Sequence, residues 1–99
     1  MNRQEHLLTV TAEECAEIEQ SISKGLRFGL YEPICLKPDK TNEEEILKEV
    51  YHLMAMVEML QEENILKIIP PDEIRMIKET KKRNVEKYMA ESKKKGLLI

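Results

Sequence analysis

The chain has 99 residues, a formal net charge of −3 and no tryptophan, and 35% of its residues are charged. An acidic balance argues against nucleic acid as a partner, and a chain of this length is expected to form one small domain over residues 1–99. Only three glycines and four prolines occur, while leucine, isoleucine and six methionines supply most of the apolar mass, which favours an all-α fold.

The first predicted helix covers residues 4–26. Small or apolar side chains recur there at three- and four-residue steps, at Leu8, Thr11, Cys15, Ile18, Ile22 and Leu26. Pro33 and Pro38 then exclude a continuous helix, so residues 28–40 are predicted to form a loop. Cys15 and Cys35 have no metal-ligand spacing, and two buried or half-buried thiols are favoured over a disulfide.

Two further helices are predicted over residues 42–63 and 72–94. Thr41 and Glu44 have the spacing of a capping box, and Asn64 is a plausible stop for the second helix. Asp72 or the proline before it opens the third helix, and Gly96 is its natural C-cap. Three helices make a thin core, so we expect the bundle to complete it by self-association.

No membrane partner is expected. The polar residues 1–6 lack the apolar core of a signal peptide, and no apolar run approaches the roughly 18 residues that a transmembrane helix needs. The sequence therefore predicts a soluble, cytoplasmic protein.

Two pairs of polar residues carry the candidate chemistry. Glu14 and Glu17 lie about 60° apart on one face of the first helix, and Glu49 and His52 repeat this spacing on the second helix. If the apolar stripes pack together, the two pairs can face one another, and clustered carboxylates favour hard divalent ions such as Mg²⁺ or Mn²⁺. Solvated glutamates on helix surfaces are the alternative interpretation.

These residues also carry a family resemblance. The pattern Glu13-Glu14-x-x-Glu17, followed by Glu49-x-x-His52, resembles the E-E-x-x-E … E-x-x-D signature of the MazG-like all-α nucleotide pyrophosphohydrolases. Similarity to short phage members extends through residues 13–18, 23–29, 57–60 and 82–88, so the resemblance spans about residues 5–96.

The resemblance implies hydrolysis of (deoxy)nucleoside triphosphates to a monophosphate and pyrophosphate with Mg²⁺, or Mn²⁺, as the cofactor. Glu14, Glu17 and Glu49 would bind the metal, with His52 at the fourth corner, and Glu13 and Glu14 would be the catalytic carboxylates. Family members form dimers or tetramers, and a phage-encoded member would work in the host cytoplasm.

Basic residues supply candidate contacts to the nucleotide. Lys24 and Arg27 follow the first acidic pair by one to three turns and could bind phosphates. Lys82, Lys87 and Tyr88 share the third helix and gain support from the resemblance. Each of them could equally be part of a solvated face.

The chain departs from the family pattern at one position. His52 stands where the signature has aspartate, and a neutral imidazole suits Mg²⁺ less well than a carboxylate does. Two functions therefore stay open: a pyrophosphohydrolase, and a catalytically impaired relative that binds or sequesters a nucleotide or a nucleotide-derived signal. A helical interaction protein without a nucleotide site is a third, less favoured alternative.

Overall fold

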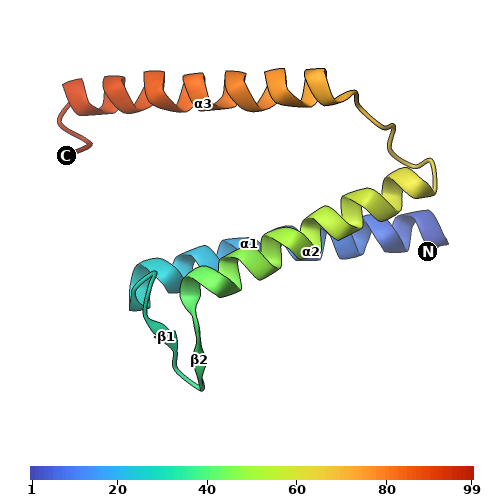
Figure 1. The fold of residues 1–99 in the computed structure, drawn as a ribbon, viewed down its shortest axis with the longest axis horizontal. Helices are drawn as coiled ribbons and strands as arrows, with labels where there is room; N and C mark the ends of the chain where they lie inside the picture. Colours follow the sequence, from blue (N-terminus) through green and yellow to red (C-terminus); the bar gives the residue numbers. More distant parts are fainter. The chain divides into compact units, whose positions relative to one another are not determined.

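The computed structural model describes residues 1–99, which form three helices and one two-stranded sheet (Figure 1). The predicted all-α fold is therefore confirmed for the bulk of the chain, with the small sheet as an addition. The backbone divides into two compact units, Met1–Lys67 and Ile68–Ile99, and each is described by itself. The single domain over residues 1–99 stays a prediction.

Helix α1 (Arg3–Phe28) is slightly longer than the predicted helix over residues 4–26. The Asn2 side chain caps its start by accepting a hydrogen bond from the Glu5 backbone N–H at 2.8 Å. Gly29 ends it in a backbone conformation with φ of 99°, which glycine adopts readily, and its N–H donates to the Gly25 carbonyl at 3.0 Å.

A β-hairpin replaces the predicted loop over residues 28–40. Strands β1 (Pro33–Ile34) and β2 (Lys37–Thr41) pair in antiparallel fashion, with Ile34 opposite Lys37. The prolines exclude a helix, as expected, but a two-stranded sheet has only edge strands and therefore accommodates them. Backbone hydrogen bonds from Asn42 to Glu32 and from Glu43 to Leu30 then join the hairpin to the next helix.

Helix α2 (Asn42–Glu62) begins at the predicted cap. The Thr41 hydroxyl accepts a hydrogen bond from the Glu44 N–H at 3.2 Å. The reciprocal contact differs from a capping box, because the Glu44 carboxylate lies 3.3 Å from the Thr41 hydroxyl rather than binding its backbone N–H. The helix stops just before Asn64, which has a left-handed φ of 60°.

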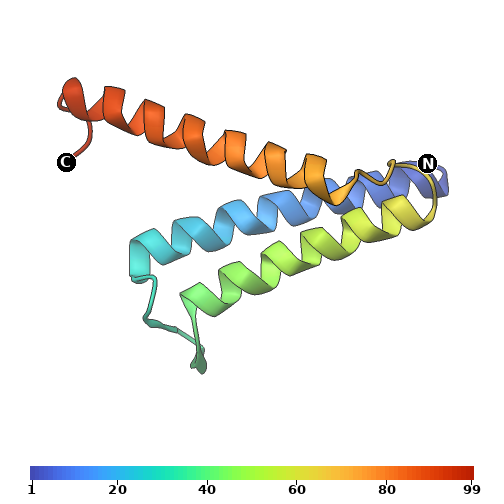
Figure 2. The same ribbon diagram turned by 45° about the horizontal axis from the view of Figure 1, so that its top comes forward.

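The two helices run side by side in opposite directions, with the hairpin at one end (Figures 1 and 2). Leu7 and Leu60 are the buried apolar side chains between them. At the other end, the Arg3 guanidinium binds both carboxylate oxygens of Glu63 at 2.8 Å. The helices are thus joined near both ends.

The stripe of α1 that packs shares only the half-buried Thr11 and Ile18 with the predicted one. Leu8, Ile22 and Leu26 are exposed, whereas the buried residues of α1 are Leu7, Ser21 and Gly25. Small residues at the buried positions let the two helices approach closely, and this leaves the more apolar neighbouring stripe uncovered. The two cysteines are free thiols, as predicted, but the expectation that they are buried or half-buried is wrong: Cys15 lies on the uncovered stripe and Cys35 in the hairpin, and both are exposed.

Helix α3 (Pro71–Lys94) forms most of the second unit and begins at the second proline, as predicted. Gly96, with φ of 74°, follows the C-cap residue Lys95, and the Leu97 N–H donates to the Ser92 carbonyl at 2.9 Å. No residue of α3 is buried. None of the three helices has both the length and the apolar character that a membrane span requires.

Candidate metal centre

Glu14 lies within the packed face of α1. The buried and half-buried positions of this face follow one another at three- and four-residue steps, at Leu7, Thr11, Glu14, Ile18, Ser21 and Gly25. The spacing is that of a helix seam, in which an apolar residue would ordinarily occupy the Glu14 position. A carboxylate there points toward α2 rather than into bulk solvent.

Glu49 occupies the matching position on α2. It is one of only two buried residues in the middle and last turns of this helix, and its side chain is 9% exposed. A buried carboxylate is costly unless it is paired or binds a cation. His52 follows one turn later and is about half exposed, so it lies at the rim of the seam.

The three side chains converge on one point. His52 Nδ1 lies 3.3 Å from Glu49 Oε2 and 3.6 Å from Glu14 Oε2. One potential ligand atom from each of the three residues lies within 4.8 Å of the other two. The structure therefore brings together three of the four predicted metal ligands, two carboxylates and one imidazole.

The donor set fits a divalent cation. Glu14 Oε2 is buried and has no hydrogen-bond partner, which leaves a negatively charged oxygen unsatisfied inside the seam. An ion bound between Glu14, Glu49 and His52 would satisfy that oxygen and reduce the repulsion between the two carboxylates. Three protein ligands would also leave coordination positions free for water and substrate.

Lys48 contributes a positive charge that the sequence reasoning missed. Its Nζ lies 3.0 Å from Glu45 Oε1 and 3.9 Å from Glu49 Oε1. Hydrogen bonding from Lys48 holds the pKa of the Glu45 carboxyl below its ordinary value, and Glu45 raises the pKa of Lys48. Only the three-residue spacing of Glu45 and Lys48 could have indicated this pair, and such pairs are common on helices.

The remaining acidic candidates lie outside the cluster. Glu17, the fourth predicted metal ligand, is exposed and lines the neighbouring cleft instead of joining Glu14 and Glu49. Glu13 is also exposed and is not a member of the group. Of the two carboxylates on α1 that were predicted as ligands, only Glu14 thus lies beside Glu49 and His52 of α2.

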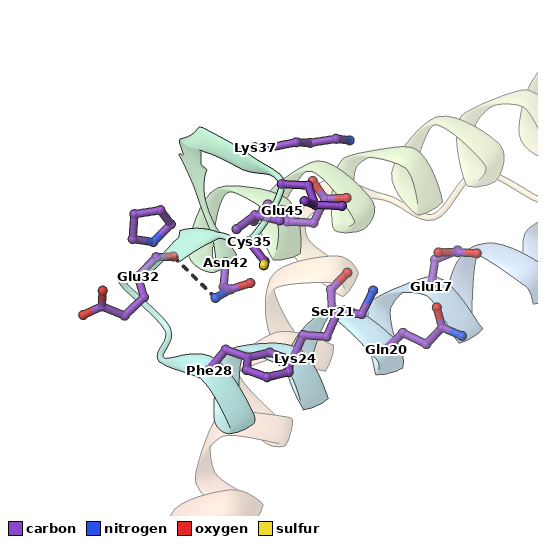
Figure 3. Close-up of a pocket in the computed structure, with 13 residues that line it drawn as sticks. Glu17, Gln20, Ser21, Lys24, Phe28, Glu32, Cys35, Lys37, Asn42 and Glu45 are labelled. Carbon is purple, nitrogen blue, oxygen red and sulfur yellow. Dashed lines mark hydrogen bonds between the residues drawn. The ribbon is translucent and has the colours of Figure 1, made fainter.

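A cleft of about 730 Å³ begins one helical turn from the cluster (Figure 3). Figure 3 shows its side chains coming from the second half of α1, from the hairpin and from the start of α2. The lining residues are Glu17, Gln20, Ser21, Lys24, Phe28, Glu32, Pro33, Ile34, Cys35, Leu36, Lys37, Asn42 and Glu45. The cleft combines an apolar wall with two lysines and three glutamates, and is large enough for a small organic ligand.

Asn42 fixes one wall of this cleft. Its buried side chain donates to the Gly29 carbonyl at 2.8 Å. It also lies 3.4 Å from the Glu32 carbonyl, to which it donates a second hydrogen bond (Figure 3). Sequence reasoning missed Asn42 and the hairpin residues, because a helix-start asparagine gives no sign that it will hold a loop. The hairpin is the element that turns the helix pair into a cleft.

The predicted phosphate contacts of α1 have different surroundings. Lys24 lines the cleft, as expected for a residue that contacts a ligand. The Arg27 guanidinium lies over the Phe28 ring, 4.7 Å from its centroid, and is not part of the cleft lining. The structure thus places one of the two near the cleft.

The predicted contacts of α3 belong to the second unit. Lys82 lines a shallow hollow between neighbouring turns, and Tyr88 lines another beside the C-terminal residues. The Lys87 ammonium lies 5.9 Å from the centroid of the Tyr88 ring. All three side chains are exposed, and their part in ligand binding stays a prediction.

Comparisons with protein-family models, with curated proteins and with solved structures found no match to the chain.

Proposed function

We propose that the chain is a divalent-metal-dependent hydrolase that converts nucleoside or deoxynucleoside triphosphates to monophosphates and pyrophosphate. One observation carries the proposal: Glu14, Glu49 and His52 present ligand atoms within 4.8 Å of one another, and the Glu14 oxygen among them is buried and unsatisfied. Mg²⁺, or Mn²⁺, is the proposed cofactor. The MazG-like sequence pattern supplies the reaction type.

The chemistry of the cluster supports this reaction. A bound divalent ion polarises a phosphoryl group and lowers the pKa of an attacking water. Glu14 and Glu49 would hold the ion at the helix seam, while the exposed Glu13 is proposed to orient water. Lys24, on the cleft side of the cluster, would neutralise phosphate charge, and Arg27 is proposed to do so from the adjoining turn.

The cleft supports a nucleotide as the ligand. Phe28, Ile34 and Leu36 offer apolar surface for a base, and Lys24 and Lys37 offer positive charge for the phosphates. Glu17 lies at the end of the cleft nearest the cluster, where an approaching ligand could draw it toward the metal. Lys82, Lys87 and Tyr88 stay candidates for nucleotide contacts from the second unit.

Self-association is part of the proposal. Leu8, Ile22 and Leu26 form an exposed apolar stripe on α1 that a second copy of the chain could cover. The prediction of a dimer or tetramer is therefore carried forward. Light scattering coupled to gel filtration measures the assembly, and a Leu26→Asp variant should shift it toward the monomer.

Nucleotide binding without turnover is the second candidate function. It is favoured by the composition of the cluster, which has two carboxylates and an imidazole where the family signature implies four carboxylate ligands. A smaller negative charge binds Mg²⁺ less tightly and could leave a nucleotide bound but uncleaved.

A panel of nucleoside triphosphates, incubated with Mg²⁺ or Mn²⁺ and followed by pyrophosphate detection, tests both candidates. Turnover that disappears in Glu49→Gln and persists in Glu62→Gln supports the hydrolase, since Glu62 is an exposed glutamate at the end of the same helix. Nucleotide binding without pyrophosphate release supports the sequestering protein. Equal turnover in both variants contradicts the metal centre.

A further inference from the structure

We propose that His52 is a metal ligand through Nδ1 and that it makes the centre selective for a first-row transition ion, such as Mn²⁺, Co²⁺ or Zn²⁺, over Mg²⁺. The inference rests on the metal centre of the proposed function and specifies the class of ion that the centre takes. It requires that the imidazole face the carboxylates at ligand spacing, that no other carboxylate replace it, and that the donor set discriminate between ions.

The spacing of the ligand atoms meets the first requirement. Ligand atoms about 2.1 Å from one ion lie about 3.0 Å apart at right angles and about 3.4 Å apart in a tetrahedral arrangement. His52 Nδ1 lies 3.3 Å from Glu49 Oε2 and 3.6 Å from Glu14 Oε2. Both separations from the imidazole nitrogen are therefore close to those of atoms that share an ion, and the two carboxylate oxygens lie within 4.8 Å of one another.

The surroundings of the cluster meet the second requirement. With no ligand in the cleft, Glu17 is exposed and outside the group, so it does not supply a third carboxylate when the ion binds alone. Lys48 lies 3.9 Å from Glu49 Oε1, on the opposite oxygen from the one that approaches His52. The ion would therefore meet one free oxygen of Glu49, the unsatisfied oxygen of Glu14 and the imidazole.

The donor set discriminates between ions. Mg²⁺ prefers oxygen ligands in a near-ideal octahedron, whereas imidazole nitrogen suits the later first-row ions. Affinity for a mixed nitrogen and oxygen site rises from Mn²⁺ toward Co²⁺ and Zn²⁺. Replacing the imidazole by a carboxylate should favour Mg²⁺, so His52→Asp is the informative variant.

The chain contains its own control. It has two histidines, and the second, His6, is exposed in the first turns of α1 and is not a member of the cluster. A His6→Ala variant removes one imidazole from the protein without touching the proposed ligands.

The experiment measures binding of the ions alone to the full, untagged chain after treatment with a chelator. Mn²⁺ binding is followed by loss of the electron paramagnetic resonance signal of the free aqua ion, and Mg²⁺ binding by competition against it. We expect Mn²⁺ to bind at least roughly tenfold more tightly than Mg²⁺ in the wild type and in His6→Ala. This preference should fall severalfold in His52→Asp and also in His52→Gln, which keeps a neutral polar side chain.

An unchanged preference in both His52 variants, or an equal loss in His6→Ala, would overturn the inference. Folding of each variant is checked by circular dichroism, and the preference is compared only among folded chains. The outcomes separate the inference from the proposed function. Selective Mn²⁺ binding without triphosphate turnover contradicts the hydrolase and supports the inference. Turnover with equal affinities for Mn²⁺ and Mg²⁺ supports the hydrolase and contradicts the inference.

Discussion

A Glu14→Gln substitution should stabilise the metal-free protein while removing its response to metal. The Glu14 side chain is 23% exposed, but its Oε2 atom is buried and has no hydrogen-bond partner. A buried unsatisfied group costs about 1–3 kcal/mol, and partial exposure of the side chain places Glu14 toward the lower end, at about 1–2 kcal/mol. Glutamine has the same shape, carries no charge, and can donate an N–H to Glu49.

The expected change is large enough to measure by thermal unfolding. In a domain of this size, 1 kcal/mol shifts the melting temperature by about 4–8 °C, so Glu14→Gln should melt several degrees above the wild type in the presence of a chelator. An ion at 100 times its Kd stabilises the wild type by about 2.7 kcal/mol. With Mn²⁺ added, the order of the two melting temperatures should therefore reverse.

Glu19→Gln is the matched control, because Glu19 is exposed on the same helix and lies outside the cluster. It should leave the melting temperature unchanged with and without the ion. A Glu14→Gln protein that is less stable than the wild type in chelator would refute the unsatisfied-carboxylate argument. An equal gain from Mn²⁺ in both proteins would refute the metal centre.

Three further predictions concern the helix pair. Gly25→Ala should raise the free energy of unfolding in urea by about 0.5–1 kcal/mol, because alanine favours a helix. A Cβ there would meet the side-chain ends of Ile46 and Leu30, each at 3.4 Å, which is the short end of ordinary contact. A loss of stability would show that the seam cannot accept a methyl group. Leu60→Ala should cost about 2–5 kcal/mol, because Leu60 is 1% exposed, and a urea midpoint within error of the wild type would contradict this packing. Hydrogen bonding from Arg3 lowers the pKa of Glu63, so this pair contributes stability above a pH of about 4.5, and the contribution is lost as the pH falls through the lowered pKa. Urea midpoints measured between about pH 6 and pH 3 should therefore fall less steeply in Glu63→Gln than in the wild type, and parallel curves would exclude a contribution from the pair.

The helices could be predicted because the residue types at their ends favour helix starts or helix stops locally. Thr41 and the second proline of the Pro70-Pro71 pair mark helix starts whatever the rest of the chain does, and Asn64 and Gly96 adopt the left-handed backbone that ends a helix. Local signals of this kind do not depend on which face of a helix is covered.

The packed face of α1 could not be predicted in the same way. Periodicity favours the stripe with more apolar mass, which contains Leu8 and Leu26, but the structure buries the stripe with Ser21 and Gly25. Small side chains permit close approach of the helices, whereas a hydrophobicity pattern takes no account of side-chain size. The buried stripe includes Glu14, which therefore lies in the contact between the two helices.

The predicted meeting of polar residues from two helices is observed for Glu14, Glu49 and His52, while their binding of a metal stays a prediction. Glu14, Glu49 and His52 come together because Glu14 faces α2 across the seam, where Glu49 and His52 lie one turn apart. Glu17 lies on the same helix as Glu14 but one turn nearer the hairpin, where the cleft opens. The hairpin itself gives a weak signal, because its strands contain prolines and are two and five residues long.

The ion pair between Arg3 and Glu63 has a mechanical consequence for the centre. It joins residues 60 positions apart at the free ends of α1 and α2, while the hairpin joins the other ends covalently. A slide of one helix along the other would break this pair, and a slide of a single turn, about 5.4 Å, would exceed the separations among Glu14, Glu49 and His52. An exposed ion pair that adds little stability can therefore still help to keep the two helices in register. In this way it helps to maintain the distance between Glu14 on α1 and Glu49 on α2.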